Sequence, residues 1–219
     1  MCWSWTADLA AGGVITAVGV VAVAHVRRAG DLPLAALPLL LGVHQLTEAV
    51  VWLGQEGRVG AGPAAAARTL WAAIAYPLLP LLIPVAVLLV AASARRRVML
   101  GFVLVGAATS AVLAYALAAG PVTADVVGHT VRYGVSVPVG PLLVAGYLIA
   151  TVGALLASGQ RGVRMLGVVC GIGALVCTLL WQAAFVSTWC ALAALCSLLV
   201  LRWVRGRSVA SVAEERSHG

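Results

Sequence analysis

The chain has 219 residues, of which 63% are apolar and only 10% are charged, and its mean hydropathy is +1.07. A soluble domain carries about a quarter charged residues, so this composition excludes an ordinary soluble protein and indicates a membrane protein. The net charge is +7, but no basic stretch is interleaved with aromatic residues, so nucleic-acid binding is not expected.

Apolar runs long enough to cross a hydrocarbon core of about 30 Å take up nearly the whole chain. They predict an all-α integral membrane protein, a seven-transmembrane helix bundle in one domain over residues 1–204. A cytoplasmic, disordered tail is expected at 205–219. No basic region precedes the first run, so a cleaved signal peptide is not expected. The predicted spans are 7–26, 33–54, 66–92, 97–119, 139–157, 162–183 and 186–204.

The arginines set the predicted orientation, because basic residues gather in the cytoplasmic loops of membrane proteins. Most of them fall on one side of the predicted spans, which places the N-terminus outside and the C-terminus inside. We therefore expect a multi-pass protein of the cell membrane, in contact with membrane lipids. Only Arg58, Arg68 and Arg132 fall on the outer side, and the inner set is Arg27, Arg28, Arg95, Arg96, Arg97, Arg161, Arg164, Arg202, Arg205, Arg207 and Arg216.

The connection between the fourth and fifth spans is too polar to cross a membrane. From Val126 to Val137 its apolar residues approach alternation with a period of two, around His129, Arg132 and Tyr133. This pattern predicts a short extracellular hairpin over the outer mouth of the bundle. An ordinary extended loop is the alternative.

Ionisable residues inside a span are costly, at roughly 2.5–3.5 kcal/mol on insertion scales, and by default suggest function. Glu48 lies near the outer end of the second span, with His44 one turn before it and Trp52 one turn after it. The four-residue spacing puts these side chains on one helix face, which Gln45 joins. A polar patch that holds helices together, or a Glu48 that reaches the interface, is the alternative.

A second acid, Asp8, begins the first span from the same side. It is a candidate functional acid, although an aspartate in the first turn also suits an ordinary helix start. The third span contains Tyr76 and Pro77, where a kink would widen a cavity between helices. Six of the seven tryptophans map to the outer half, which predicts an outward pocket or, alternatively, an interfacial belt: Trp3, Trp5, Trp52, Trp71, Trp181 and Trp189.

Neither the cysteines nor the histidines form a metal motif. Cys170, Cys177, Cys190 and Cys196 are spaced as small packing residues on two spans, and a reactive Cys2 is a minor alternative. We expect no metal and no cofactor.

Several segments resemble a family of uncharacterised small multi-pass membrane proteins from actinobacteria that begin with MCFS. They are the opening MCWS, in which Trp3 replaces the usual Phe, the block Leu32–Trp52, the segment Gly120–Tyr133 and TWCALAAL near the end. The family name implies no activity. In size, span number and membrane acids, the chain is also similar to the drimentine-type bacterial integral membrane terpene cyclases, which cyclise a farnesyl chain attached to an indole cyclodipeptide.

The residues suit such chemistry. Protonating a neutral prenyl chain needs a carboxylic acid that keeps its proton, an apolar cavity that excludes water, and aromatic faces that stabilise a carbocation. Glu48 is the predicted acid, oriented by His44 or Gln45, and Asp8 or Asp125 is the predicted base. The lipophilic prenylated substrate is expected to contact Gln45, Trp52, Trp71, Tyr76, His129, Tyr133, Trp181 and Trp189.

Two other functions fit the same residues. A protein that binds or transports a lipid or small molecule would use Glu48 as an anchor in the same pocket. A membrane hydrolase would instead hold zinc with His44, His129 and Asp8, as a catalytic zinc takes three protein ligands and an open position.

Overall fold

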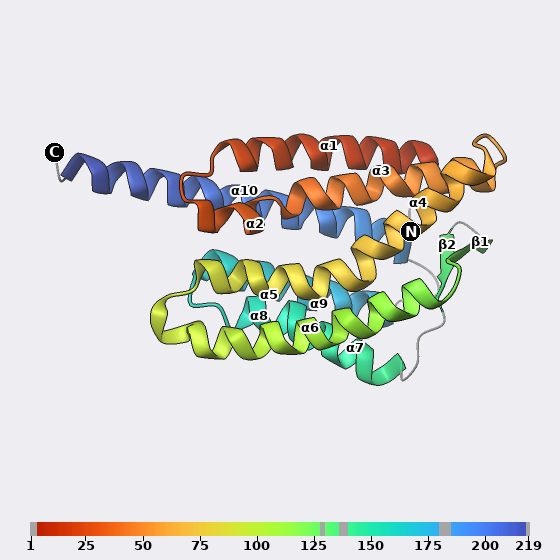
Figure 1. The fold of residues 1–219 in the computed structure, drawn as a ribbon. Coiled ribbons are helices and arrows are strands. Elements are labelled where there is room, and N and C mark those ends of the chain that lie inside the picture. The colour runs from red at the N-terminus through yellow and green to blue at the C-terminus, as the bar shows by residue number, and fades with distance from the viewer. Residues whose placement is uncertain (1–3, 128–129, 136–139, 180–184, 218–219) are drawn as a thin grey trace.

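The computed structural model describes residues 4–127, 130–135, 140–179 and 185–217 (Figure 1). Side chains at 127, 130, 177–179, 185–191 and 210–217 lie outside the description. The long helices share one axis, so their connections gather at two ends (Figure 1). One end carries two strands and the connection from α3 to α4, and we call it the hairpin end. The other carries the connections α1–α2, α5–α6 and α8–α9, and we call it the arginine-rich end.

The elements follow the predicted order with several breaks. They are α1 (Trp5–Ala24), α2 (Leu32–Ala35), α3 (Leu37–Gln55), α4 (Ala61–Ala73), α5 (Leu79–Val90), α6 (Arg96–Ala119), β1 (Thr123–Val127), β2 (Thr130–Gly134), α7 (Gly140–Leu148), α8 (Ala154–Leu156), α9 (Arg161–Leu179) and α10 (Phe185–Ser217). Short 3-10 turns precede α2 and α6, and π-helical turns join α4 to α5 and α7 to α8.

Helical segments long and apolar enough to cross a membrane agree with the predicted all-α membrane class, although in the part of the chain that the structure describes fewer than the seven predicted spans meet this description. Within the described residues four segments qualify: Trp5–Ala24, Ala29–Gln55, Ala61–Val90 and Ser93–Ala119. A shorter apolar stretch covers Gly140–Leu156. The chain is therefore a mostly helical membrane protein.

Glycines bring α1 and α3 into close contact. A Cβ on Gly12 would lie 2.9 Å from the Leu46 side chain, one on Gly19 would meet the backbone of Leu39, and one on Gly42 would meet Thr16. The residue numbers of these contacts rise along α1 and fall along α3, so the two helices run antiparallel in a constant register. Continued towards the hairpin end, the same register places Asp8 beside the helical turn between Glu48 and Trp52. Small residues thus position the two acids.

A π-helical turn at Ile74–Leu78 interrupts the third span, where Pro77 has no N–H to donate. Other helices satisfy the carbonyls at this break. The Tyr147 hydroxyl donates to the Ala75 carbonyl at 2.9 Å, and the Ser110 hydroxyl donates to the Pro77 carbonyl at 2.5 Å. The predicted proline break is therefore present, and it ties α4 and α5 to α6 and α7.

The hairpin is present as an antiparallel pair of strands. Thr123 pairs with Gly134 and Val126 with Val131, so the strands begin three residues earlier than predicted and end at Gly134. Ala124 and Val131 are buried against a cluster that includes Trp52. The hairpin is thus packed onto the end of the bundle.

The prediction of a disordered tail is wrong, because α10 continues to Ser217 and extends beyond the other helices (Figure 1). From Val204 to Ser217 the chain contains no proline and a single glycine, so little in this segment opposes a helix. Arg207 also anchors it, since its Nε donates to the Asp31 carboxylate at 2.8 Å.

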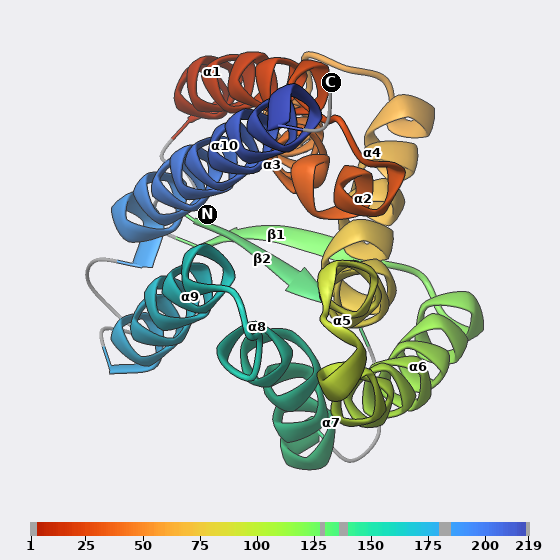
Figure 2. The same ribbon diagram turned by 90° about the vertical axis from the view of Figure 1, so that its left-hand side faces the viewer.

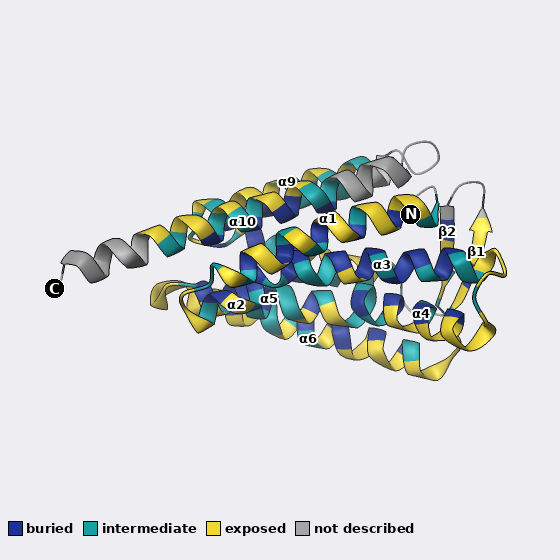
Figure 3. Cartoon of the chain, turned by 90° about the horizontal axis from the view of Figure 1, so that it is seen from above, coloured by how far each residue is buried: buried dark blue, intermediate teal, exposed yellow. Residues whose placement is uncertain are grey.

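Burial is densest along α3, whereas α1 and α6 keep broad exposed faces that suit contact with lipid (Figure 3). The largest apolar cluster lies towards the arginine-rich end and includes Leu34, Val87, Met99, Leu155 and Val204. Seen along the axis, α1, α2, α3 and α10 lie on one side and α6, α7 and α8 on the other (Figure 2).

Candidate functional site

The predicted polar face of α3 is buried at the hairpin end. His44 is 6% exposed, Gln45 1%, Glu48 0% and Trp52 7%. Four-residue spacing along a straight helix keeps these side chains on one face, as the sequence predicts. The partner of that face is α4, and the hairpin covers their junction.

Trp71 of α4 is the centre of the site and is 2% exposed. Its indole Nε1 donates a hydrogen bond to Glu48 Oε2 at 3.2 Å. Its ring stacks on Tyr133 of β2, with centroids 3.6 Å apart and planes 4° apart. His44 lies 4.8 Å from the ring centroid and Tyr76 meets the ring edge-on at 6.1 Å. Trp71 thus connects the acid, the hairpin and two further aromatic side chains.

Asp8 lies in the first turn of α1 and is completely buried. Ser4 caps this helix by accepting from the Ala7 N–H at 3.3 Å, so Asp8 is not needed as the cap. Among the described residues, neither Asp8 oxygen makes a hydrogen bond of good geometry. The Trp52 indole nevertheless lies close enough to Asp8 to interact with it as a donor. Asp8 and Glu48 interact electrostatically, so two buried acids share one region. Two such carboxyls strongly disfavour being charged together.

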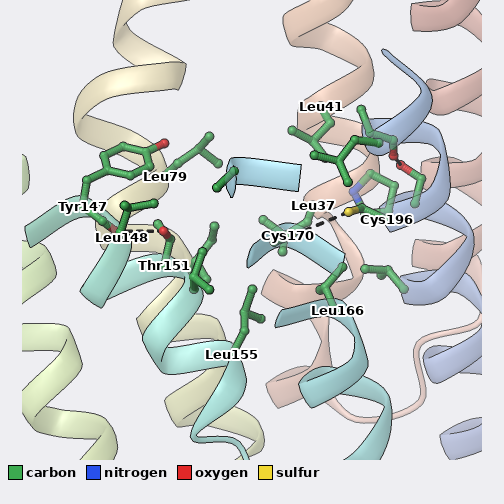
Figure 4. Close-up of a pocket in the computed structure, with 18 residues that line it drawn as sticks. Leu37, Leu41, Leu79, Tyr147, Leu148, Thr151, Leu155, Leu166, Cys170 and Cys196 are labelled. Carbon is green, nitrogen blue, oxygen red and sulfur yellow. Dashed lines mark hydrogen bonds between the residues drawn. The ribbon is translucent and has the colours of Figure 1, made fainter. Parts of the chain in front are cut away.

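One apolar cavity borders this cluster, and a second adjoins the first deeper in the bundle. The first has a volume of about 390 Å³ and is lined by His44, Trp71, Tyr76 and Tyr147 together with aliphatic side chains of α6 and α7. The second, of about 170 Å³, lies among α3, α5, α9 and α10 and the segment from α7 to α8 (Figure 4). The two share the wall residues Leu41, Leu79, Tyr147 and Leu148.

The acids do not themselves line either cavity. His44 and Trp71 line the larger cavity, and Glu48 is connected to that cavity through its hydrogen bond with the Trp71 indole. Tyr147 lines both cavities, yet the pattern of acids and tryptophans gave no reason to select it. An isolated tyrosine in an otherwise apolar span is the one signal for it in the sequence.

Several predicted site residues lie elsewhere. His129 and Trp181 fall outside the described residues, as does the side chain of Trp189. Asp125, the alternative base, is exposed on β1 and pairs in register with Arg132. The structure therefore brings together Asp8, His44, Gln45, Glu48, Trp52, Trp71, Tyr76 and Tyr133.

Tyr133 carries the hairpin's contribution to the site. Burial raises the pKa of its phenol well above the ordinary value, and the nearby Glu48 and Asp8 carboxyls add to the rise. The phenol therefore keeps its proton at neutral pH and can act only as a neutral hydrogen-bonding group.

Metal ligands do not gather in the part of the chain that the structure describes, where no three His, Cys, Asp or Glu side chains form a group. Cys170 of α9 and Cys196 of α10 meet with their sulfur atoms 3.6 Å apart, in the wall of the smaller cavity (Figure 4). The remaining proposed zinc ligand, His129, lies outside the description.

These features define a helical membrane protein with two buried acids beside apolar, partly aromatic cavities. A family model described as a family of unknown function, DUF6629, matches residues 1–216, so the chain belongs to that family. Neither the curated proteins nor the solved structures include a match to it.

Proposed function

We propose that this protein is an integral membrane terpene cyclase that folds a prenyl chain of the farnesyl type inside its apolar cavities. Protonation of a double bond or an epoxide by a buried carboxylic acid would start the cyclisation, without a metal. One observation carries the proposal: the completely buried Glu48 is hydrogen-bonded to Trp71, whose ring forms a wall of the larger cavity.

The surroundings suit an acid that acts on a neutral hydrocarbon. A carboxyl closed off from water is held in its protonated form, and an apolar cavity keeps water away from a carbocation. Trp71, Tyr76 and Tyr147 present aromatic rings at that cavity, and such faces stabilise a positive charge. The similarity to drimentine-type cyclases in size, span number and membrane acids points the same way, whereas the resemblance to the actinobacterial proteins that begin with MCFS implies no activity.

The proton balance needs one acid and one base. Glu48 gives a proton to the substrate carbon or oxygen when the Trp71 ring moves aside, and the carbocation later loses a proton to a carboxylate. Asp8 suits the second role better than Asp125, because Asp8 is buried beside Glu48 whereas Asp125 is exposed on the hairpin. His44 lines the cavity and lies against the Trp71 ring, and in this proposal it helps to hold Trp71 and the acid in place. The net reaction is an isomerisation of the prenyl chain.

A membrane orientation accompanies this function. We propose seven spans, with the hairpin end outside and the arginine-rich end in the cytoplasm of a multi-pass cell-membrane protein. The connections at the arginine-rich end hold Arg27, Arg95 and Arg161, which supports this orientation by the positive-inside rule.

Binding without chemistry is the second candidate function. His44 and Trp71 line the cavity but the acids do not, which favours a protein that holds or transports a lipid-like molecule. The same cavities would then enclose the ligand, and Glu48 would act only as a support for Trp71.

Substitution of the acids separates these functions. Glu48→Gln keeps the size of the side chain and its hydrogen-bonding capacity but cannot deliver a proton, so it should abolish turnover of a prenylated substrate without loss of folding. Glu48→Asp should keep partial activity, and Asp8→Asn tests the other acid. Glu56→Gln is the matched control, because Glu56 is exposed and pairs with Arg58 at 3.5 Å. Full turnover by Glu48→Gln would rule out Glu48 as the donor.

A further inference from the structure

Two hydrogen-bond donors at the hairpin end flank Trp71 and have no acceptor in the part of the chain that the structure describes. Arg68 lies one turn before Trp71 on α4, so both side chains share a helix face. Its Nε is closed to solvent and has no hydrogen-bond partner among the described residues. Tyr133 stacks on the Trp71 ring, and its hydroxyl is likewise buried and unpartnered within the described part of the chain.

Such a pair is costly unless something accepts from it. A buried donor without an acceptor costs roughly 1–3 kcal/mol, and more when it carries charge. The acids of the site do not relieve this cost, since no ion pair joins Arg68 to Asp8, Glu48 or any other described acid. Tyr133 and Arg68 are close enough to interact electrostatically, so both donors lie in the same region beside Trp71.

The depth of Arg68 suits the headgroup of an amphiphile. Arg68 is seven residues into α4, which is roughly 10 Å from the start of the helix at the hairpin end. Its neighbour Trp71 is a wall of the larger cavity. Neither Arg68 nor Tyr133 lines that cavity, but Trp71 forms part of its wall and stacks on Tyr133. A ligand whose chain lies in the cavity can therefore bring its polar end close to these two donors at the hairpin end.

We propose that Arg68 and Tyr133 form a binding site for a phosphate or diphosphate group carried on an apolar chain. Guanidinium N–H groups bind phosphate oxygens in strong, charge-assisted hydrogen bonds, and the phenol supplies a second donor to the same group. The phosphate stays attached during binding and no bond to it is broken. That the chain is a prenyl chain rests on the proposed function, whereas the phosphate contact does not.

Binding measured apart from turnover tests this site. The wild-type protein, in micelles of an uncharged detergent, is titrated with farnesyl phosphate, with farnesol, with inorganic phosphate and with a short-chain phosphatidic acid. Quenching of tryptophan fluorescence reports binding beside Trp71. Farnesyl phosphate is expected to bind at least about tenfold more tightly than farnesol, because it adds charge-assisted hydrogen bonds to the same chain contacts.

The variants assign that difference to particular donors. Arg68→Gln and Tyr133→Phe should each reduce the preference for the phosphate several-fold, while Tyr133→Phe keeps the stacking ring. Arg132→Gln is the matched control, because Arg132 adjoins Tyr133 but is exposed, and it should keep the full preference. Phosphatidic acid that competes through Arg68 would identify a membrane lipid as the occupant, and farnesyl phosphate alone would identify a prenyl phosphate.

The site would be overturned if the wild-type protein bound farnesol and farnesyl phosphate with equal affinity. It would also be overturned if Arg68→Gln and Tyr133→Phe left the preference for the phosphate intact, or if Arg132→Gln reduced that preference as much as they do. The proposed cyclase function fails separately. A phosphate preference without any cyclised product would support the site and refute the cyclase. Turnover without the phosphate preference would support the cyclase and refute the site.

Discussion

The hydrogen bond between Trp71 and Glu48 is the link between acid and cavity, and its strength can be measured. Trp71→Phe keeps an aromatic ring against Tyr133 but removes the Nε1–H that donates to Glu48. Hydrogen bonds between helices in membrane proteins contribute about 0.6 kcal/mol on average and up to ~1.7 kcal/mol. Because both residues are at most 2% exposed and the bond is 3.2 Å long, we expect about 1 kcal/mol.

A double-mutant cycle isolates this contribution. The total loss for Trp71→Phe should be roughly 2–3 kcal/mol, since the smaller ring also leaves space in a packed site. Glu48→Leu removes the acceptor, and the double variant should lose about 1 kcal/mol less than the sum of the two single losses. Equilibrium unfolding in mixed micelles, followed by helical ellipticity, gives all four free energies of unfolding.

Trp203→Phe is the matched control for that cycle. Its indole donates to Gln160 at 2.7 Å at the arginine-rich end, so its loss should simply add to that of Glu48→Leu. If the losses in free energy of unfolding for Trp71→Phe and Glu48→Leu added within about 0.3 kcal/mol, the link would be refuted, because the two side chains would then contribute independently.

Three further predictions test the packing, the arginine-rich end and the orientation. Gly42→Ala should lower the free energy of unfolding by about 1–3 kcal/mol because its Cβ meets α1, whereas Gly13→Ala, which meets open space, should not destabilise; calorimetry of both decides. Arg207→Ala should cost about 1–3 kcal/mol because it strands a buried carboxylate, and the exposed Arg205→Ala should change the midpoint of thermal unfolding little. A cysteine at Ala94 should resist a membrane-impermeant maleimide in intact cells; labelling from outside would invert the orientation.

The sequence predicts the polar face of α3 because helical spacing is local. Glu48 and its neighbours on α3 share a face whatever surrounds that helix, and composition alone indicates a membrane protein. The alternation around Tyr133 likewise predicts a hairpin. The first strand starts at Thr123, three residues before the predicted start, because Thr123–Val127 pairs with the second strand. Alternation within one strand does not specify this pairing.

Contacts between elements are the part that sequence patterns do not supply. Asp8 lies near Glu48 only because glycines fix the register of α1 against α3. That register depends on how the surfaces of both helices fit together, which neither helix's sequence specifies alone. Trp71 is one of several outer tryptophans in the sequence, and its central role comes from the crossing of α4 beneath the hairpin. The sequence predicts disorder for the tail because of its charges. It does not predict the ion pair of Arg207 with Asp31, which joins residues far apart in the chain.

The central claim is that a buried carboxylic acid starts the reaction by giving up a proton, and solvent deuterium tests it most directly. Protein equilibrated in D₂O is incubated with the prenylated substrate, and the product is analysed by mass spectrometry. Protonation by Glu48 followed by loss of a substrate proton predicts a cyclised product that carries one deuterium, formed by the wild-type protein and not by Glu48→Gln. A cyclised product without deuterium, or no product from the wild-type protein, would contradict the claim.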